Sequence, residues 1–353
     1  MKTKGEELRA LTIARFVAAM WVVLYHCGGW PDEIMLVIGA GGIGVPFFFI
    51  LSGFVLAYTA RDLTDSAGRR NFYARRIARI YPIYLLAWAL YGLWLLMHAE
   101  ERSALSGALT ALLLQSWVPG EHGTWNSPAW SLSAEALFYA VFPVIYLGLA
   151  RVTSRKLIGV LALMWVANLA HVAGYQMPWG DYAYYLPPLR LPEFVMGIIL
   201  GLLFTRHGAL TRGWMWAGVF VAGVLAVTMT RSAIGPWWEG AIVPVFCGLV
   251  MALASVQVRG RISDIGVLLG KASYSIYILQ IPVWSLMWAA LGQEMHQDRG
   301  LLELASYWAV LIVISVAVYR YVETPAERWI KYRLHREPDD YPQKVPPVRF
   351  SRP

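Results

Sequence analysis

Long apolar runs separated by short polar segments follow one another along almost the whole of this 353-residue chain. A membrane-spanning helix needs about 20 such residues, because the hydrocarbon core of a bilayer is about 30 Å thick. Eleven runs approach that length, at residues 11–29, 34–58, 80–98, 105–117, 128–149, 157–174, 185–204, 214–230, 238–256, 266–290 and 301–322. The chain is 58% hydrophobic and only 15% charged, whereas soluble domains are about a quarter charged. These runs predict a polytopic helical membrane protein.

The charges between the runs decide which runs span the membrane. Basic loops stay on the cytoplasmic side, and the N-terminal segment is basic, with Lys2 and Lys4. Residues 105–117 are too few to cross, and if they did cross, every later basic loop, from residues 151–156 onward, would face outside. If residues 105–117 instead form a re-entrant or interfacial segment, all of these basic loops lie on the cytoplasmic side. We therefore predict an all-α bundle of about ten transmembrane helices plus one short re-entrant or interfacial helix, with both termini cytoplasmic.

The ends of the chain differ in composition from the spans. The membrane domain is expected over residues 1–330, and residues 331–353 form a basic, Pro-rich tail that we expect to be disordered and cytoplasmic. No small-x-small cleavage site follows the first apolar run, so that run should stay attached.

Charge and cysteine usage argue against other classes of function. The net charge is +8, but the basic residues form short clusters between apolar runs instead of the continuous basic face of a nucleic-acid-binding protein. Cys27 and Cys247 lie in or beside apolar runs and are interpreted as small hydrophobic residues. No His or Cys cluster has ligand spacing, so neither a disulfide nor a metal site is expected.

The first span contains two ionisable residues, which cost about 2.5 to 3.5 kcal/mol each at bilayer depth and so indicate function. Arg15 and His26 are 11 residues apart, which places them within about 20° on one helix face and roughly 16 Å apart along the axis. Taken singly, Arg15 could reach the inner headgroups and His26 could be an interfacial residue. Together they place a cation toward the cytoplasm and an imidazole toward the outer leaflet.

A carboxylate follows in the span that begins at Pro128, with Ser127 as its expected N-cap. Glu135 lies about two turns into that helix, and the predicted topology brings it to the depth of His26. A carboxylate beside a histidine fixes its tautomer and supports it as a base. The alternative is an isolated structural glutamate bonded to a helix end.

Further polar residues lie near the predicted outer side and at mid-depth. Arg190 could stabilise an oxyanion, or it could form an ordinary ion pair with Glu193 that locks helices together. Tyr277 and Gln280 share a helix face with Ser273. That face suits a polar cavity and also suits hydrogen bonding between helices.

A basic cluster precedes the third apolar run. Arg75 and Arg79 are neighbours at i and i+4, with Arg76 one step round the helix, and such a patch can bind phosphates through paired hydrogen bonds. The alternative is an ordinary anchor on lipid headgroups.

Taken in order, these segments resemble the acyltransferase-3 family of integral membrane acyltransferases, which O-acylate surface polysaccharides and related acceptors. The resemblance extends from about residue 8 to 328 and rests on seven motifs: Arg15 with His26, residues 47–54, 75–82, 130–135, 190–197, 270–279 and 323–325. The chain departs from the family at Gln280, where many relatives have a histidine, so we assign no proton transfer to it. Its tail is too short to be the soluble hydrolase-like domain that some relatives carry, so we expect the membrane domain itself to meet the acceptor.

The resemblance implies a membrane-bound O-acyltransferase that takes an acyl group from cytoplasmic acyl-CoA. The expected acyl group is acetyl, and the expected acceptor is a hydroxyl of a surface or secreted polysaccharide or of its lipid-linked precursor. It implies the bacterial inner membrane, no permanently bound cofactor, and acyl-CoA, a saccharide acceptor and the bilayer as partners. The competing hypothesis is a proton-coupled transporter or flippase of a small molecule or lipid-linked sugar.

The site residues expected for this reaction fall into three groups. The catalytic residues are His26, Glu135 and Arg190. The donor-binding residues are Arg15, Arg75, Arg76 and Arg79, and the substrate-binding residues are Trp130, Ser133, Glu193, Tyr277 and Gln280.

Overall fold

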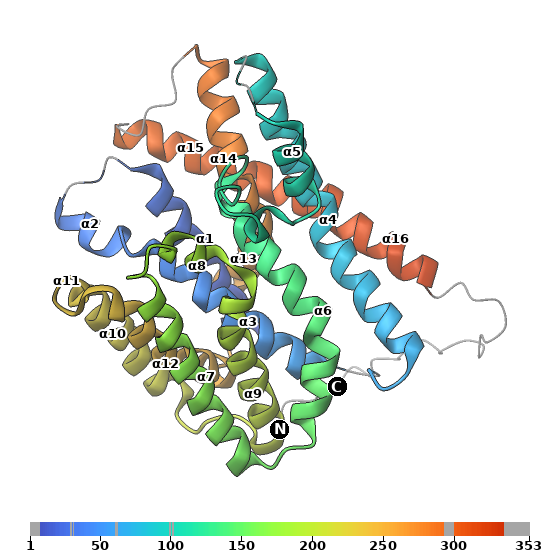
Figure 1. Cartoon of the computed structure of the whole chain (residues 1–353), viewed down its shortest axis with the longest axis vertical. Helices are drawn as coiled ribbons and strands as arrows, with labels where there is room; N and C mark the ends of the chain where they lie inside the picture. The colour runs from blue at the N-terminus through green and yellow to red at the C-terminus, as the bar shows by residue number, and fades with distance from the viewer. Residues whose placement is uncertain are drawn as a thin grey trace, which may run out of the picture.

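The computed structural model describes residues 8–28, 30, 32–60, 63–98, 100, 102–292 and 300–334, and within these ranges every regular element is a helix. Its α-helices are α1 (Arg9–Cys27), α2 (Asp32–Ile38), α3 (Gly44–Thr59), α4 (Ser66–Met97), α5 (Ala104–Ala111), α6 (Trp130–Ala150), α7 (Ser154–Gly174), α8 (Gly180–Tyr185), α9 (Leu191–His207), α10 (Gly213–Met229), α11 (Arg231–Ile234), α12 (Trp238–Ser255), α13 (Arg261–Lys271), α14 (Ser273–Ala290), α15 (Leu301–Val318) and α16 (Thr324–Leu334). Figure 1 shows them as one helical bundle. The tail predicted from residue 331 lies outside the described residues from residue 335 onward.

The helices follow the predicted apolar runs. Among the described residues, eight helical segments are long and apolar enough to cross a membrane: Arg9–Cys27, Ile34–Thr59, Ser66–Met97, Ser127–Ala150, Ser154–Gly174, Pro187–His207, Arg231–Ser255 and Leu301–Trp329. The bent pair α13 and α14 adds a ninth, and α10 is a shorter apolar helix. Residues 105–117 form only α5 and the short turn η2 (Gln115–Trp117). The all-α membrane bundle is confirmed, whereas the count of ten and the cytoplasmic termini stay predictions.

Hydrogen bonds between loops group the helix ends into two sets. Arg206 donates to the carbonyl oxygens of Ala150 and Val152, at 2.8 and 2.7 Å, so the α6–α7 and α9–α10 connections lie together. Tyr182 donates to the carbonyl of Trp117 at 3.0 Å, which joins two loops of the opposite set. These pairs are the ones that the loop charges assign to a common side.

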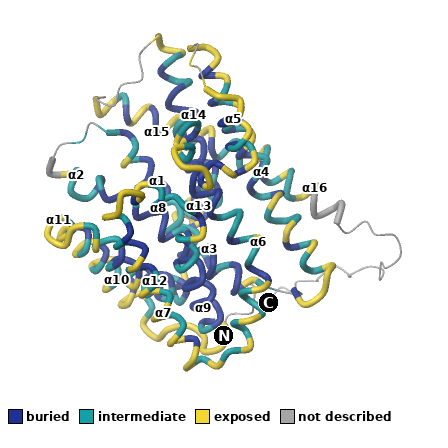
Figure 2. Tube along the Cα trace, viewed as in Figure 1, coloured by how far each residue is buried: buried dark blue, intermediate teal, exposed yellow. Residues whose placement is uncertain are grey.

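Two glycines bring α3 and α9 into backbone contact at the centre of the bundle. A Cβ added at Gly53 would collide with the carbonyl oxygen of Phe194, and one at Gly197 would collide with that of Ile50. Small residues allow membrane helices to approach this closely. Figure 2 shows the buried positions concentrated along α3 and α9, with exposed positions on outer helices such as α7.

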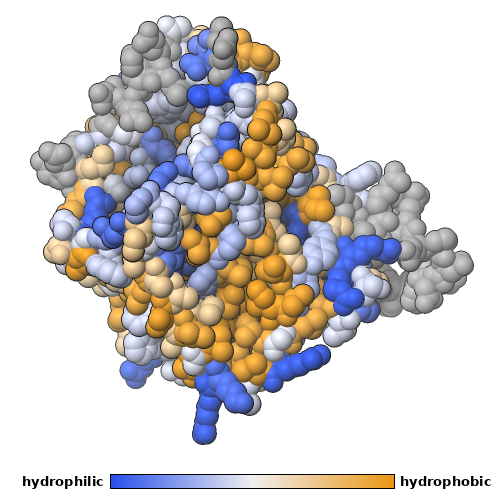
Figure 3. Space-filling view, viewed as in Figure 1, coloured by the Kyte–Doolittle hydropathy of each residue, from blue (hydrophilic) through white to orange (hydrophobic). Residues whose placement is uncertain are grey.

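The surface is apolar where lipid contact is expected. Side chains on the outer helices are exposed and hydrophobic, such as Leu163 at 60% and Val313 at 68%. On the face in Figure 3, hydrophobic residues cover much of the middle and hydrophilic residues project at the edges. A bilayer would cover the apolar area.

Two interruptions of helical geometry lie next to charged residues, one buried and one half-buried. A π-helical turn, η6 (Tyr319–Glu323), joins α15 to α16 and leaves Glu323 buried. The axes of α13 and α14 meet at 57°, just after Lys271. Short π-helical segments occur mainly at functional sites, and this one lies beside the cavity described next.

Candidate active site

A cavity of about 600 Å³ lies between α1, α3, α4, α6 and α14. Along α6 its lining runs from Phe142 to Ser131, positions that are roughly 16 Å apart at the rise of a helix. On α14 the lining extends to Tyr277, and α3 contributes an apolar wall that includes Phe48 and Phe49.

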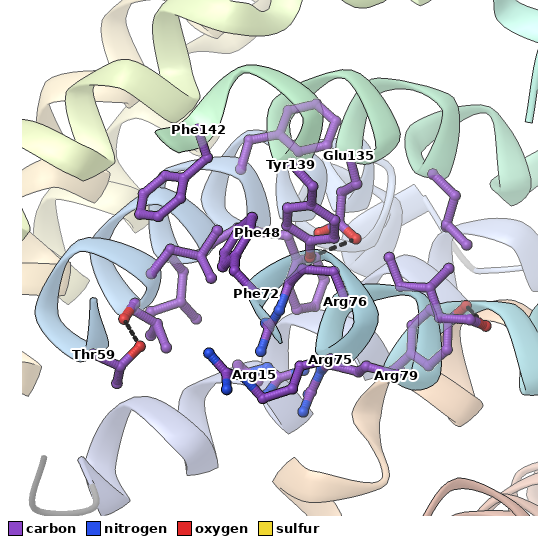
Figure 4. Close-up of a pocket in the computed structure, with 18 of the residues that line it drawn as sticks. Arg15, Phe48, Thr59, Phe72, Arg75, Arg76, Arg79, Glu135, Tyr139 and Phe142 are labelled. Carbon is purple, nitrogen blue, oxygen red and sulfur yellow. Dashed lines mark hydrogen bonds between the residues drawn. The ribbon is translucent and has the colours of Figure 1, made fainter. Parts of the chain in front are cut away.

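Four arginines line this cavity: Arg15 from α1 and Arg75, Arg76 and Arg79 from α4. Figure 4 shows them gathered on one side, with Glu135 and Tyr139 across from them. The structure therefore brings together all four residues that the sequence predicted for donor phosphates. Their position on a cavity wall favours a ligand over a simple anchor in the headgroup layer.

The guanidinium groups of this arginine cluster have unused hydrogen-bond donors. Within the described part of the chain, no side-chain hydrogen bond links any of the four to an acceptor, and only Arg79 has ion pairs, at 3.7 Å to Glu327 and 4.0 Å to Glu323. Arg76 instead packs over the rings of Phe72 and Tyr139. Each guanidinium carries five N–H donors, so the cluster suits an anionic ligand with several acceptor oxygens.

The local sequence explains why the α4 arginines share this wall. The helix begins after Asp65, whose side chain accepts a hydrogen bond from the amide of Gly68 at 2.6 Å and so caps the first turn. Arg75 and Arg79 are then one turn apart, and the Arg75–Arg76 pair widens the basic face.

Glu135 lies with the arginine cluster, and the expected contact with His26 is not observed. Its carboxylate accepts a hydrogen bond from Tyr139 Oη at 3.3 Å. His26 Nδ1 lies 2.8 Å from the carbonyl oxygen of Val22, its neighbouring side chain is Gln280, and it does not line the cavity. The prediction that Glu135 orients His26 is therefore wrong, because Glu135 faces the arginine-lined space whereas His26 is at the far end of α1.

Polar groups on α6 and α14 lie between the cavity and His26. Tyr277 Oη is 2.9 Å from Ser131 Oγ, and Gln280 Nε2 donates to the carbonyl of Tyr277 at 2.7 Å. Gln280 Oε1 is buried without a hydrogen-bond partner. Tyr277 lines the cavity, and Gln280 lies one turn further along α14, next to His26.

Arg190 forms a separate buried cluster. Its side chain is 1% exposed, pairs with Glu193 at 3.0 Å and donates to Tyr175 Oη at 3.0 Å. The guanidinium also lies against the rings of Phe49, Trp130 and Tyr184. Neither Arg190 nor Glu193 lines the cavity. This geometry favours a structural ion pair over a role in oxyanion stabilisation. The pair lies within one segment, and its links to α7 run through Tyr175, which follows that helix, and through Asn168, which donates to Glu193 Oε1 at 3.2 Å.

Of the five expected substrate-binding residues, only Tyr277 lines the cavity. Ser133 is fully buried and donates to the carbonyl of Leu113 at 2.7 Å, which fastens α6 to the preceding loop. Trp130 packs against Tyr184 and Tyr185. The remaining two, Glu193 and Gln280, have the positions described above.

The structure adds residues that were not among the predicted site residues. Tyr139 is at i+4 from Glu135, and that spacing is a signal for a shared helix face. A second cavity of about 300 Å³ shares Arg15 and Arg79 with the first and adds Lys271, Glu323 and Glu327. The i, i+4 spacing of these two glutamates was visible in the sequence, but their partner Arg79 is on another helix.

In the described ranges, no group of three or more His, Cys, Asp or Glu residues could hold a metal ion.

Comparison with known proteins connects this architecture to a reaction class. A family model described as an acyltransferase domain matches residues 8–320. The acyltransferase MdmB of Streptomyces mycarofaciens is 30% identical over 94% of this chain and 95% of its own length. The exopolysaccharide production protein ExoZ of Rhizobium meliloti is 27% identical over 82% of this chain and 90% of its own length. No solved structure matches the chain.

Proposed function

Because this chain belongs to the acyltransferase family and is a multi-pass membrane enzyme that transfers acyl groups, we propose that it is an acyl-CoA-dependent O-acetyltransferase. The acceptor is a hydroxyl of a surface or secreted polysaccharide or of its lipid-linked precursor, and the enzyme works in the bacterial inner membrane. The observation that carries this proposal is the arginine cluster, whose donors are unused and face a large cavity.

The two parts of the cavity match the two parts of an acyl-CoA. The nucleotide end of the donor carries phosphates, and guanidinium groups bind phosphate oxygens through paired, charge-assisted hydrogen bonds. The acyl-pantetheine arm is uncharged and fits the wall formed by side chains such as Phe48, Phe49 and Leu132. No resident cofactor is needed, because a thioester is already an activated acyl group.

His26 is the proposed general base. The acceptor hydroxyl attacks the thioester carbonyl, its proton passes to the imidazole, a C–O bond forms and the C–S bond breaks. CoA leaves as the thiol after taking up a proton. The cavity lining ends at Ser131 and Tyr277, one helical turn from Gln280 and its neighbour His26, so the thioester end of the donor needs to reach past Tyr277.

The acceptor is proposed to approach His26 from the side opposite the arginine cluster. Tyr25 is 45% exposed there, and its ring meets that of His26 edge-on with centroids 5.2 Å apart. Exposed aromatic rings combine an apolar face with a polar edge, which suits the faces and hydroxyls of a sugar.

Membrane vesicles of known orientation test the donor, the reaction and the side of the membrane together. Inverted vesicles, whose cytoplasmic face is outside, should release thiol from added acetyl-CoA when an acceptor is present. Right-side-out vesicles should release none, because acetyl-CoA does not cross a bilayer. Thiol release only from right-side-out vesicles would contradict the proposed orientation, and release from neither would contradict the donor.

The competing transporter has a distinct result in the same vesicles. It would move a labelled small molecule or lipid-linked sugar across the membrane without consuming acetyl-CoA. Membership of the acyltransferase family favours group transfer, so we expect thiol release with a matching amount of acetylated product.

A further inference from the structure

Arg79 is shared by the two cavities, and its ion-pair partners both follow α15. Its Nη1 lies 4.0 Å from Glu323 Oε1 and 3.7 Å from Glu327 Oε1. Both distances exceed that of a hydrogen bond. Arg79 therefore has nearby countercharges but keeps its N–H donors available for a ligand.

The two glutamates differ in how firmly they are held. The Glu323 side chain is 2% exposed, and its Oε2 is buried without a hydrogen-bond partner. It belongs to the π-helical turn η6, where Thr324 Oγ1 donates to the carbonyl of Tyr319 at 2.9 Å. The Glu327 side chain is 27% exposed and lies one turn later on α16, which packs against α4.

The buried position of Glu323 matters because a second arginine, Arg15, lies near Arg79. Arg15 lines both cavities and has no ion pair within 4.0 Å in the described ranges, and the charges that act on it most strongly include Arg79 and Glu323. Two guanidinium groups that face one space repel each other. A fixed carboxylate between their helices offsets that repulsion before any ligand binds.

We propose that Glu323 is a positioning residue that keeps Arg15 and Arg79 directed toward the donor, and that Glu327 competes with the donor's phosphates for Arg79. When a phosphate binds, Arg79 exchanges its loose pair with Glu327 for direct hydrogen bonds, and Glu327 turns toward solvent. This inference rests on the proposed function, because it takes acyl-CoA as the donor.

The two neutral variants should change donor affinity in opposite directions. Removal of the buried charge in Glu323→Gln leaves the repulsion between Arg15 and Arg79 offset less, because the remaining nearby partner of Arg79, Glu327, is partly exposed. Acetyl-CoA should therefore bind roughly tenfold more weakly. Removal of the partly exposed competitor in Glu327→Gln should tighten binding by about two- to fivefold, the range of exposed ion pairs. Glu323→Asp should restore part of the affinity, and kcat at saturating donor should change little in all three.

The experiment measures binding of two donors to the purified full-length protein: acetyl-CoA, and S-acetylpantetheine, which carries the same thioester without phosphates. The variants should differ only toward acetyl-CoA. Asp264→Asn is the matched control, because Asp264 pairs with Arg9, which lines neither cavity, and it should leave both affinities unchanged.

The outcomes separate this inference from the proposed function. If the unmodified protein binds acetyl-CoA no better than S-acetylpantetheine, the phosphate assignment of the proposed function fails. If it prefers acetyl-CoA but Glu327→Gln binds it equally or more weakly, the competition is disproved. Unchanged affinity in Glu323→Gln, or equal losses toward both donors, would disprove the positioning role. If Glu323→Gln fails to fold, two other results test the inference: the acetyl-CoA affinity of Glu323→Asp tests the positioning role, and the direction of the affinity change in Glu327→Gln tests the competition.

Discussion

Two groups of arginine lie inside this bundle, and they differ in what satisfies their charge. Arg190 is 1% exposed, is paired with Glu193 at 3.0 Å and is surrounded by aromatic rings. The arginine cluster lines a cavity of about 600 Å³, and only Arg79 has carboxylates within 4.0 Å among the described residues. Glu193 balances the charge of Arg190 within the protein, although Arg190 Nε and Nη2 make no hydrogen bond among the described residues. For the arginine cluster, we propose that an external anion supplies the balancing charge.

The difference shows how a structural arginine in a membrane protein can be distinguished from a ligand-binding one. A buried charge without partners is costly, so a cation that serves the fold is supplied with them by the chain itself. Arg190 has an ion pair, a tyrosine hydroxyl and aromatic faces within its own cluster. Where guanidinium groups line a cavity and most have no carboxylate nearby, we propose that the missing partner arrives with the substrate.

The largest expected effect is on folding, in Arg190→Met. Breaking a buried ion pair by removing one partner costs about 3 to 5 kcal/mol, because the other charge is left uncompensated. The variant should therefore show a strongly lowered unfolding temperature and poor yield, measured by thermal unfolding in detergent. The double variant Arg190→Met/Glu193→Met should recover part of that loss. A stable Arg190→Met protein with impaired acyl transfer would place Arg190 in the active site. It would then contradict the distinction between a structural Arg190 and a ligand-binding arginine cluster.

His26→Ala should produce the largest effect on the reaction itself. Loss of a general base typically lowers the rate by about 10²- to 10⁴-fold, while the arginine cluster that holds the donor stays intact. Acyl transfer should fall by that factor in a thiol-release assay, and acetyl-CoA affinity should be unchanged. His98→Ala is a control on another helix, since His98 lines neither cavity. Near-normal transfer in folded His26→Ala protein would refute the proposed base.

Arg75→Ala and Arg79→Ala should weaken donor binding without unfolding the protein. Each removes hydrogen bonds to a charged ligand, which are worth roughly 1 to 3 kcal/mol. Titration with acetyl-CoA measures the loss. Arg155→Ala is the control, because this exposed arginine lines neither cavity. Unchanged affinity in both variants would return the α4 arginines to the role of lipid anchors.

Arg15→Lys should have the smallest effect. Lysine keeps the charge but loses the planar fork that binds phosphate through two hydrogen bonds, so acetyl-CoA affinity should fall by about 1 kcal/mol. Added salt should weaken the donor binding of both proteins by screening the partly exposed cluster. A lysine variant equal to the unmodified protein would show that Arg15 contributes charge alone.

The sequence was sufficient for the fold class and for grouping the cationic residues of the candidate site, whereas the number of spans stays a prediction. Apolar run lengths and loop charges predicted the bundle and the short segment at residues 105–117, because bilayer thickness and charge placement act on each segment separately. The α4 arginines were predicted to act together for the same reason, since residues three and four apart on one helix are always neighbours. Motif order was enough to indicate the family.

Only the tertiary structure decided which side chains from different helices meet. The sequence placed Glu135 with His26 from depth alone, but the rotation of α6 turns the face that carries Glu135 and Tyr139 toward the arginine cluster. Likewise, Arg190 and Glu193 were visible as a pair, but the rings that enclose them come from α3, α6 and α8. A run of apolar residues determines that a helix crosses the membrane, whereas its rotation is set by packing against neighbours. That packing separates Arg190, whose ion-pair partner is in the chain, from the arginine cluster, for which we propose a partner in the substrate.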